Sequence, residues 1–170
     1  MKKEVLAALN ASAGGIFLDC TLGGGGHSEA ILEANPINTV YACDRDDRAI
    51  ARTTKRLERF GERLRVFHCP FSKVRTHIGD RRFNGVLLDL GLSTDQLREN
   101  RGFSFNDDTR LDMRMDQSEG LSAFEIVNEW GLPELIRLFK SGGVLKEARS
   151  IAMGIVNSRP IETTKEFARI

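Results

Sequence analysis

The feature that most constrains the fold is a glycine-rich loop that directly follows a short apolar run near the N-terminus. The run covers residues 16–20, the four glycines are residues 23–26, and a helical pattern over residues 27–34 comes next. A glycine-rich turn between a first strand and a helix is typical of Rossmann-like folds, because the backbone turns tightly there and approaches a ligand closely. The alternative is a turn without a ligand, although four consecutive glycines cost conformational entropy to order.

Four short apolar runs predict the strands of a parallel β-sheet. The runs cover residues 16–20, 39–43, 64–68 and 85–90. Helical patterns separate them over residues 27–34, 46–60 and, more weakly, 74–82. Strands that alternate with helices and are apolar on both faces indicate an α/β fold whose parallel sheet is covered on both sides. We expect the strand order 3-2-1-4, in which the glycine-rich loop and the fourth strand border one crevice.

The character of the sequence changes after the fourth run. Residues 91–120 are rich in Asp, Arg, Asn, Ser and Gly. Helical patterns then cover residues 123–130, 133–140 and 144–156 and resume at residue 163. This change predicts a Rossmann-like domain over residues 1–94 and a loop with a helical insertion domain over residues 95–170. Because no strong strand pattern follows residue 90, we expect only the first four strands of a larger sheet and a chain truncated at its C-terminus.

Composition excludes few functional classes. The formal net charge of +1 neither requires nor excludes a nucleic-acid partner, since a basic face can exist within a neutral total. No apolar run approaches the ~20 residues of a membrane span. Cys20, Cys43 and Cys69 are far apart in sequence and form no Cys-x-x-Cys pair. We expect buried thiols in a reducing compartment, the cytoplasm, rather than a disulfide or metal site. No metal-ligand spacing is recognisable.

The residues around the loop favour S-adenosyl-L-methionine as the cofactor. Asp44 follows the second run, about 20 residues after the glycines, where an acid can bind ribose hydroxyls. A dinucleotide site expects a third glycine where Ser28 stands. Asp19 precedes the loop, and its charge repels a pyrophosphate but attracts the ammonium and sulfonium of S-adenosylmethionine. An NAD-dependent oxidoreductase is therefore the less favoured alternative.

Three further residues are candidates for the site. Asp89 ends the fourth run and is expected to face the glycine-rich loop, where it can accept a hydrogen bond from an amine of the cofactor or the substrate. The alternative role for Asp89 is to cap the next turn. Phe71 follows the third run and either packs on the adenine or belongs to the core. His27 begins the first helix and is a ligand contact, a cap or a solvated side chain.

Four motifs together resemble the bacterial 16S rRNA (cytosine-N4)-methyltransferase family. They are Asp-Cys-Thr-Leu-Gly-Gly-Gly-Gly-His-Ser at 19–28, Leu-Asp-Leu-Gly-Leu-Ser at 88–93, Arg-Gly-Phe-Ser-Phe at 101–105 and Leu-Asp-Met-Arg-Met-Asp at 111–116. The resemblance implies a class I S-adenosylmethionine-dependent methyltransferase with a helical domain inserted after the fourth strand. It also implies methylation of N4 of a cytidine in the decoding region of 16S rRNA, within the small ribosomal subunit, with neither DNA nor a membrane as partner.

The resemblance also assigns residues to the site. The family's cofactor contacts correspond here to Gly25, Gly26, His27, Asp44, Phe71, Asp89 and Gln96. Gln96 depends on the resemblance alone. Asp89 is in addition the candidate catalytic residue, as the acceptor for the cytosine amine. The chain departs from the family at Thr109-Arg110, where Gly-Pro is usual, and at residues 142–146, where two acids are lost.

The substrate surface is open to more than one interpretation. A base has to leave its stack to reach such a site. Aromatic and cationic side chains of the 98–114 region can form an RNA-facing rim: Phe103, Phe105, Arg98, Arg101, Arg110 and Arg114. Alternatively, Phe103, Phe105, Met113 and Met115 pack the insertion onto the core. The alternative functions are a methyltransferase of the same fold that acts on another RNA or a small molecule, and a non-catalytic truncated binding fragment.

Overall fold

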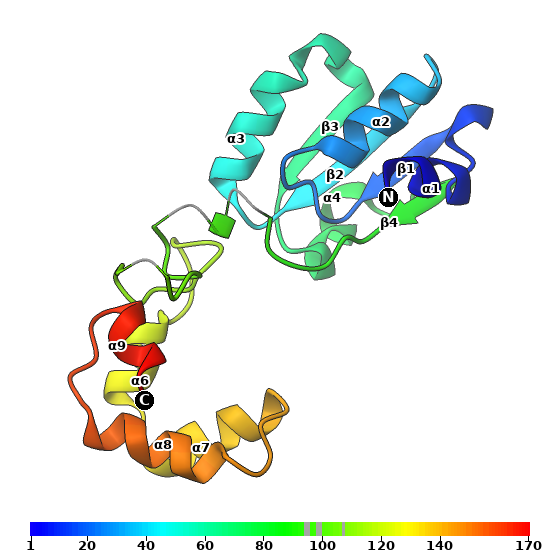
Figure 1. Ribbon diagram of the computed structural model, residues 1–170. Coiled ribbons are helices and arrows are strands. Elements are labelled where there is room, and N and C mark those ends of the chain that lie inside the picture. The colour runs from blue at the N-terminus through cyan, green and yellow to red at the C-terminus, as the bar shows by residue number, and fades with distance from the viewer. Residues whose placement is uncertain (94–95, 98–99, 107) are drawn as a thin grey trace. The chain divides into compact units, whose positions relative to one another are not determined.

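The computed structural model describes residues 1–93, 96–97, 100–106 and 108–170. The chain divides into two compact units, Met1–Ser93 and Thr94–Ile170, and each unit is described by itself (Figure 1). Among the described residues, no helix is both long and apolar enough to cross a membrane.

The first unit is a four-stranded parallel sheet with helical crossovers. Its strands are β1 (Ile16–Asp19), β2 (Thr39–Asp44), β3 (Leu64–His68) and β4 (Gly85–Leu87). Its helices are α1 (Lys2–Ala8), α2 (Gly26–Ala34), α3 (Asp47–Arg56) and α4 (Arg75–Ile78), with 3-10 turns η1 (Ala11–Ala13), η2 (Glu58–Arg63) and η3 (Phe71–Lys73). The strand order is β3-β2-β1-β4, which confirms the predicted α/β class and order. The strands therefore present their carboxyl ends at one edge of the sheet.

Two apolar clusters cover the sheet. One packs Phe17 and Val40 of the sheet against α2 and α3, with α1 contributing partly buried leucines. The other gathers Leu18 and Tyr41 with apolar residues from the α4 region. The expectation of cover on both faces holds for β1 and β2 but not for β4, because Val86 is 50% exposed.

Several elements are shorter than the sequence predicts, and the helical pattern over residues 74–82 yields only α4 at Arg75–Ile78. The helix expected over residues 46–60 ends at Arg56, and η2 follows it with Gly61 in the left-handed region at φ 53°. The strand expected to reach residue 90 ends at Leu87. The backbone N–H of Asp89 donates instead to the Oγ1 of Thr21, at 2.8 Å, so this part of the chain leaves the sheet ladder for the glycine-rich loop.

In the part of the second unit that the structure describes, helices pack on the loop that precedes them. The helices are α6 (Ala123–Glu129), α7 (Leu132–Ser141), α8 (Ala148–Asn157) and α9 (Thr164–Ala168). Capping boxes begin α6 at Ser122 and α9 at Thr163, where each hydroxyl and a glutamate three residues later satisfy free backbone N–H groups. Their core centres on Leu111, Leu135 and Ile155, so the helices and the preceding loop share one apolar interior.

The helix predicted to begin at residue 144 begins at Ala148 instead. The reason lies at the end of α7, where Gly143 adopts φ 93°. The N–H of Gly143 donates to the carbonyl of Lys140, and the N–H of Val144 donates to the carbonyl of Phe139. This pair of bonds is a Schellman motif, which ends one helix and keeps the next residues out of helical geometry.

Removal of a core leucine tests the independent interior of the second unit. We expect Leu135→Ala to lower the free energy of unfolding by about 2–5 kcal/mol, because Leu135 is fully buried and the variant leaves a cavity. Leu138→Ala is the matched control on the same helix, where the residue is 37% exposed and the expected loss is below about 1 kcal/mol. Urea unfolding followed by the fluorescence of Trp130, the single tryptophan, measures both. Equal losses of unfolding free energy in the two variants would contradict the placement of Leu135 in the core of the second unit.

Candidate functional site at the carboxyl edge of the sheet

The glycine-rich loop between β1 and α2 is held from two sides. On the side of β2, the N–H of Gly23 donates to the Oδ2 of Asp44 at 2.7 Å. On the side of α3, the Oγ1 of Thr53 donates to the Gly23 carbonyl and the Nη2 of Arg56 donates to the Gly24 carbonyl, both at 2.7 Å. The loop is therefore a defined structure of the protein itself, with its polar groups largely committed before any ligand is considered.

Gly25 explains why glycine is needed within the loop. Its backbone lies in the left-handed region at φ 71°, where it forms the N-cap of α2. A Cβ at this position would lie 2.4 Å from the Cγ2 of Thr53, far inside van der Waals contact. A Cβ on Gly24 would meet nothing within 4 Å. Gly25 is thus required by the backbone conformation and by packing against α3, whereas Gly24 is not.

Asp19 anchors the loop from beneath. Its side chain is buried, the Oγ of Ser28 donates to its Oδ2 at 2.7 Å, and the N–H of Thr21 donates to its Oδ1 at 3.1 Å. Burial raises the pKa of the Asp19 carboxyl above its ordinary value, although both hydrogen bonds act in the opposite direction. Both oxygens are therefore turned to the protein, and a carboxylate that attracts a cationic ligand has to be sought elsewhere at this edge.

Asp44 and Asp89 provide such carboxylates at the ends of β2 and β4. Asp44 is partly buried and accepts one backbone N–H on each oxygen, from Gly23 and from Asp46 at 3.0 Å. Each oxygen keeps a lone pair that a ribose hydroxyl can use. The side chain of Asp89 is 54% exposed, and its Oδ2 lies 3.6 Å from the Nε2 of His27.

His27 thus has a partner that sequence reasoning did not provide. It stands in the first turn of α2, and its contact with Asp89 joins the glycine-rich loop to the end of β4. Its Nδ1 is buried and has no hydrogen-bond partner among the described residues. The spacing in the sequence gives no sign of this pair, because 62 positions separate the two residues and only the parallel strand order brings them together.

The remaining predicted contacts lie in the first unit, except for Gln96. Phe71 begins η3, just after β3, and is 45% exposed, so the alternative that it is a core phenylalanine is wrong. The loop residues Gly25 and Gly26, together with His27, lie at the same edge of the sheet. Gln96 belongs to the second unit, where it is buried, and it is described there by itself.

The three cysteines lie together beneath this edge. Cys20, Cys43 and Cys69 follow or end neighbouring strands, belong to one apolar cluster, and are buried free thiols. Burial raises the pKa of each thiol. These facts confirm the prediction of buried cysteines that act as small apolar residues. Among the described residues, no group of three His, Cys, Asp or Glu side chains is arranged to hold a metal ion.

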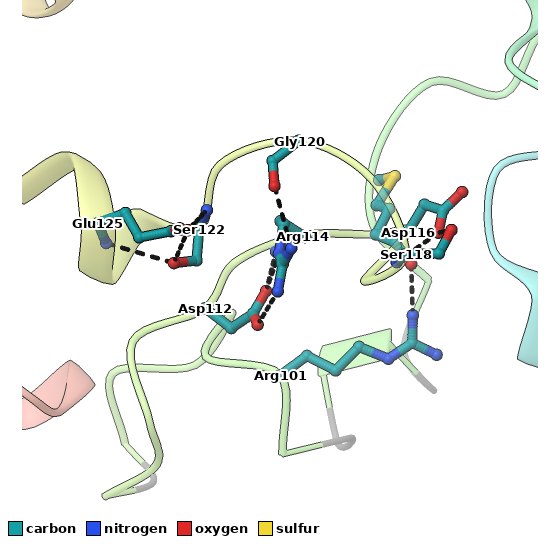
Figure 2. A network of polar contacts seen from close by, with 9 residues as sticks. Arg101, Asp112, Arg114, Asp116, Ser118, Gly120, Ser122 and Glu125 are labelled. Carbon is teal, nitrogen blue, oxygen red and sulfur yellow. Dashed lines mark hydrogen bonds and ion pairs between the residues drawn. The ribbon is translucent and has the colours of Figure 1, made fainter.

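In the second unit, the loop before α6 is organised by arginines (Figure 2). The guanidinium of Arg114 donates to both oxygens of Asp112, at 2.9 and 2.8 Å, and to the carbonyl of Gly120 at 3.0 Å. Arg114 also holds the pKa of the Asp112 carboxyl below its ordinary value. Arg101 is 2% exposed and donates to the carbonyl of Met115 at 2.7 Å. Neither arginine is therefore a free cation of a substrate rim.

Other residues of the expected rim are accessible. Phe105 is 70% exposed and Met113 is 45% exposed, whereas Phe103 and Met115 are partly buried. The guanidinium of Arg110 is exposed and lies 5.6 Å from the centroid of the Phe124 ring. Arg98 lies outside the described residues. Among the rim residues that the structure describes, the exposed aromatic and cationic side chains are thus Phe105 and Arg110.

Comparison with known proteins now identifies the family. A family model described as the MraW methylase family matches residues 1–170. The chain belongs to this methylase family. This finding confirms the family that the four sequence motifs indicated, and it agrees with the carboxylates and the glycine-rich loop at one edge of a parallel sheet.

Individual relatives of this chain carry an rRNA methyltransferase name. A "Ribosomal RNA small subunit methyltransferase H" of Synechococcus elongatus is 44% identical over 99% of this chain and 56% of that protein. One of Exiguobacterium sibiricum is 42% identical over the whole chain and 57% of that protein. The chain thus spans little more than half the length of these curated relatives. A crystal structure of an rRNA methylase from Streptococcus thermophilus matches 51% of this chain and 54% of that chain, with 19% identity and a TM-score of 0.42.

The two middle glycines provide a test of the loop. We expect Gly25→Ala to lower the free energy of unfolding by about 1–3 kcal/mol, since the new methyl group collides with Thr53 and the left-handed backbone disfavours alanine. Gly24→Ala is the matched control and is expected to change it by less than about 0.5 kcal/mol. Urea unfolding followed by circular dichroism measures both. A larger loss for Gly24→Ala than for Gly25→Ala would refute this account of the loop.

The buried carboxyl of Asp19 provides a pH test. Its pKa in the folded state is above the ordinary value of 3.8, so its contribution to stability is fully present below that value and declines as the pH rises through the folded pKa. Asp19→Asn keeps the shape of the side chain but removes the charge. We therefore expect the variant to lose less unfolding free energy than the parent between pH 4 and neutral pH. Urea unfolding over this range measures the difference, and parallel curves would contradict the raised pKa.

Proposed function

We propose that the chain uses S-adenosyl-L-methionine to methylate N4 of a cytidine in the decoding region of 16S rRNA. The observation that carries the proposal is the contact of His27 with Asp89, because it sets an accessible carboxylate beside the glycine-rich loop at the carboxyl edge of the sheet. Membership in a methylase family, and relatives whose name refers to small-subunit rRNA, support the reaction and the substrate.

The residues at this edge fit the cofactor. The accessible carboxylate of Asp89 favours a ligand that carries an ammonium and a sulfonium, and it disfavours the pyrophosphate of NAD. The exposed ring of Phe71 offers a surface on which an adenine can stack. Asp44 would accept the ribose hydroxyls, and Gly25 and Gly26 allow the close approach of the ligand. Gln96, which belongs to the second unit, stays a predicted cofactor contact that depends on the family resemblance alone.

The mechanism needs little acid–base chemistry. S-adenosylmethionine supplies a methyl group that is already activated by the sulfonium, so the task of the protein is alignment of the reactants. The cytosine amine is a poor nucleophile, since its lone pair is conjugated with the ring. Asp89 accepts a hydrogen bond from this amine and holds the nitrogen in a more reactive geometry. His27 orients Asp89 from the side of the loop.

The two units divide this work. We assign cofactor binding to residues 1–94 and recognition of the substrate to residues 95–170. The partner in this proposal is 16S rRNA in the small ribosomal subunit, with neither DNA nor a membrane involved, and the target base leaves its stack to enter the site. The three buried thiols favour a reducing compartment, which for this function is the cytoplasm.

Ligand titration tests the cofactor. By isothermal calorimetry we expect S-adenosylhomocysteine to bind and NAD not to bind. Phe71→Ala should lower the affinity for S-adenosylhomocysteine about 5- to 100-fold, because stacking of a base on an aromatic ring contributes about 1–3 kcal/mol. Phe105→Ala removes an even more exposed phenylalanine from the second unit and serves as the control, with unchanged affinity expected. Binding of NAD alone would reject the proposed cofactor.

Methyl transfer tests the reaction. Labelled S-adenosylmethionine is incubated with small ribosomal subunits that lack the modification, and the labelled nucleoside is identified. We expect N4-methylcytidine with the unsubstituted chain and no transfer with Asp89→Ala, while Asp108→Ala, an exposed aspartate of the second unit, retains transfer. Label in another nucleoside would reject the specific reaction, and transfer by Asp89→Ala at a near-normal rate would reject the role of Asp89. Cofactor binding without any transfer would favour a non-catalytic fragment.

A further inference from the structure

A cavity lies wholly within the second unit, and none of its lining residues is among those assigned to the cofactor. Its volume is about 390 Å³, and its lining residues are Arg110, Phe124, Glu162 and Thr163. This volume lies at the small end of the range of about 300–1,000 Å³ that is typical of small-ligand sites. The cavity can therefore hold a group as large as a nucleobase with its sugar.

The walls of the cavity are set by the backbone. Arg110 and Thr163 form an antiparallel bridge. The N–H of Leu111 donates to the carbonyl of Glu162 at 3.0 Å, and the N–H of Thr164 donates to the carbonyl of Thr109 at 2.9 Å. Two segments that are far apart in the sequence are thus joined by regular backbone bonds. The side chains of Arg110 and Glu162 are presented from this joined pair of segments rather than from independent loops.

The chemistry of these walls is unusual for a structural surface. The Arg110 guanidinium lies 5.6 Å from the centroid of the Phe124 ring, so an aromatic face and a cation share one wall. The structure gives neither Arg110 nor Glu162 an ion-pair partner within 4.0 Å among the residues it describes. Arg101 and Arg114, by contrast, are occupied by the protein's own acceptors. The cavity therefore combines an aromatic ring with a cation and a carboxylate that do not neutralise each other.

We propose that this cavity binds an unpaired guanine of the RNA substrate. An arginine offers two parallel N–H donors, which match the O6 and N7 acceptors of guanine. A carboxylate offers two acceptor oxygens, which match the N1–H and N2–H donors on the other edge of the same base. Among the four bases, guanine has both an edge with two adjacent acceptors and an edge with two adjacent donor groups. The inference rests on the proposed function, because it takes RNA as the substrate.

Two more features of the cavity fit this ligand. The hydroxyl oxygen of Thr163 accepts the N–H of Glu166 at 3.3 Å, which leaves its own O–H able to donate to a ribose or phosphate oxygen. Phe124 and the guanidinium plane of Arg110 are surfaces on which an unstacked base can lie. Arg110 stands where the family motif usually has a proline, so the cationic wall is a property of this chain.

Nucleotide titration tests the guanine site. The ¹⁵N-labelled chain is titrated with GMP, AMP, CMP and UMP, and the amide signals of Arg110 and Thr163 are followed by NMR. We expect GMP to shift these signals with a Kd at least roughly tenfold below those of the other three nucleotides, because a bidentate base contact discriminates on this scale. Arg110→Ala and Glu162→Gln should each lower the affinity for GMP by about tenfold or more.

Matched controls separate the site from general charge effects. Arg149→Ala and Glu129→Gln change exposed side chains of the same unit and should leave the affinity for GMP unchanged. Glu162→Gln removes only a charge from an exposed side chain, so a folding defect does not obscure its result. Equal affinities for all four nucleotides, preference for CMP, or no effect of Glu162→Gln would overturn the guanine site. Binding of S-adenosylhomocysteine, measured on the same sample, tests the proposed function separately. If the chain does not bind S-adenosylhomocysteine, the nucleotide titration still tests the guanine site.

Discussion

The bracing of the glycine-rich loop is the constraint on which the rest of the site depends. Asp44 holds Gly23 from the end of β2, and Thr53 and Arg56 hold the loop carbonyls from α3. These bonds commit the loop backbone to one shape before a ligand arrives, which reduces the entropy that binding has to overcome. Without this shape, α2 would not begin where it does, and His27 would not reach Asp89 at the end of β4.

Much of the first unit could be predicted from the sequence because its signals are local and repetitive. Four apolar runs separated by helical patterns lead directly to the strand order β3-β2-β1-β4. The end of β4 was not predictable in this way, because the N–H of Asp89 leaves the ladder for a hydroxyl that is 68 positions away, in Thr21. The start of α8 was missed for a different reason, since the Schellman motif at Gly143 overrides the helical pattern that continues past it.

The candidate site could be predicted by residue type but not by contact. The sequence indicates that Asp44 and Asp89 lie at strand ends along one edge, and the structure places them after β2 and β4, with β1 between these strands. It also suggested that Asp19 attracts a cationic ligand, whereas the folded chain turns both oxygens of Asp19 toward Ser28 and Thr21. A charge in a motif therefore says little about whether that charge faces a ligand. Hydrogen-bond partners decide the question, and these depend on how the loop folds.

The same argument separates the arginines of the second unit. By sequence alone, Arg101, Arg110 and Arg114 are equivalent candidates for contact with RNA. Arg101 is buried and donates to the carbonyl of Met115, and Arg114 donates to both carboxylate oxygens of Asp112. A phosphate or base that binds either arginine therefore has to displace an intramolecular partner first. Arg110 meets no such competition, because its guanidinium lies beside the Phe124 ring and has no ion-pair partner among the described residues, and the same holds for Glu162 in the lining of the cavity. A cation and a carboxylate that are not paired with each other can both bind one ligand, whereas the charges of an ion pair first have to separate.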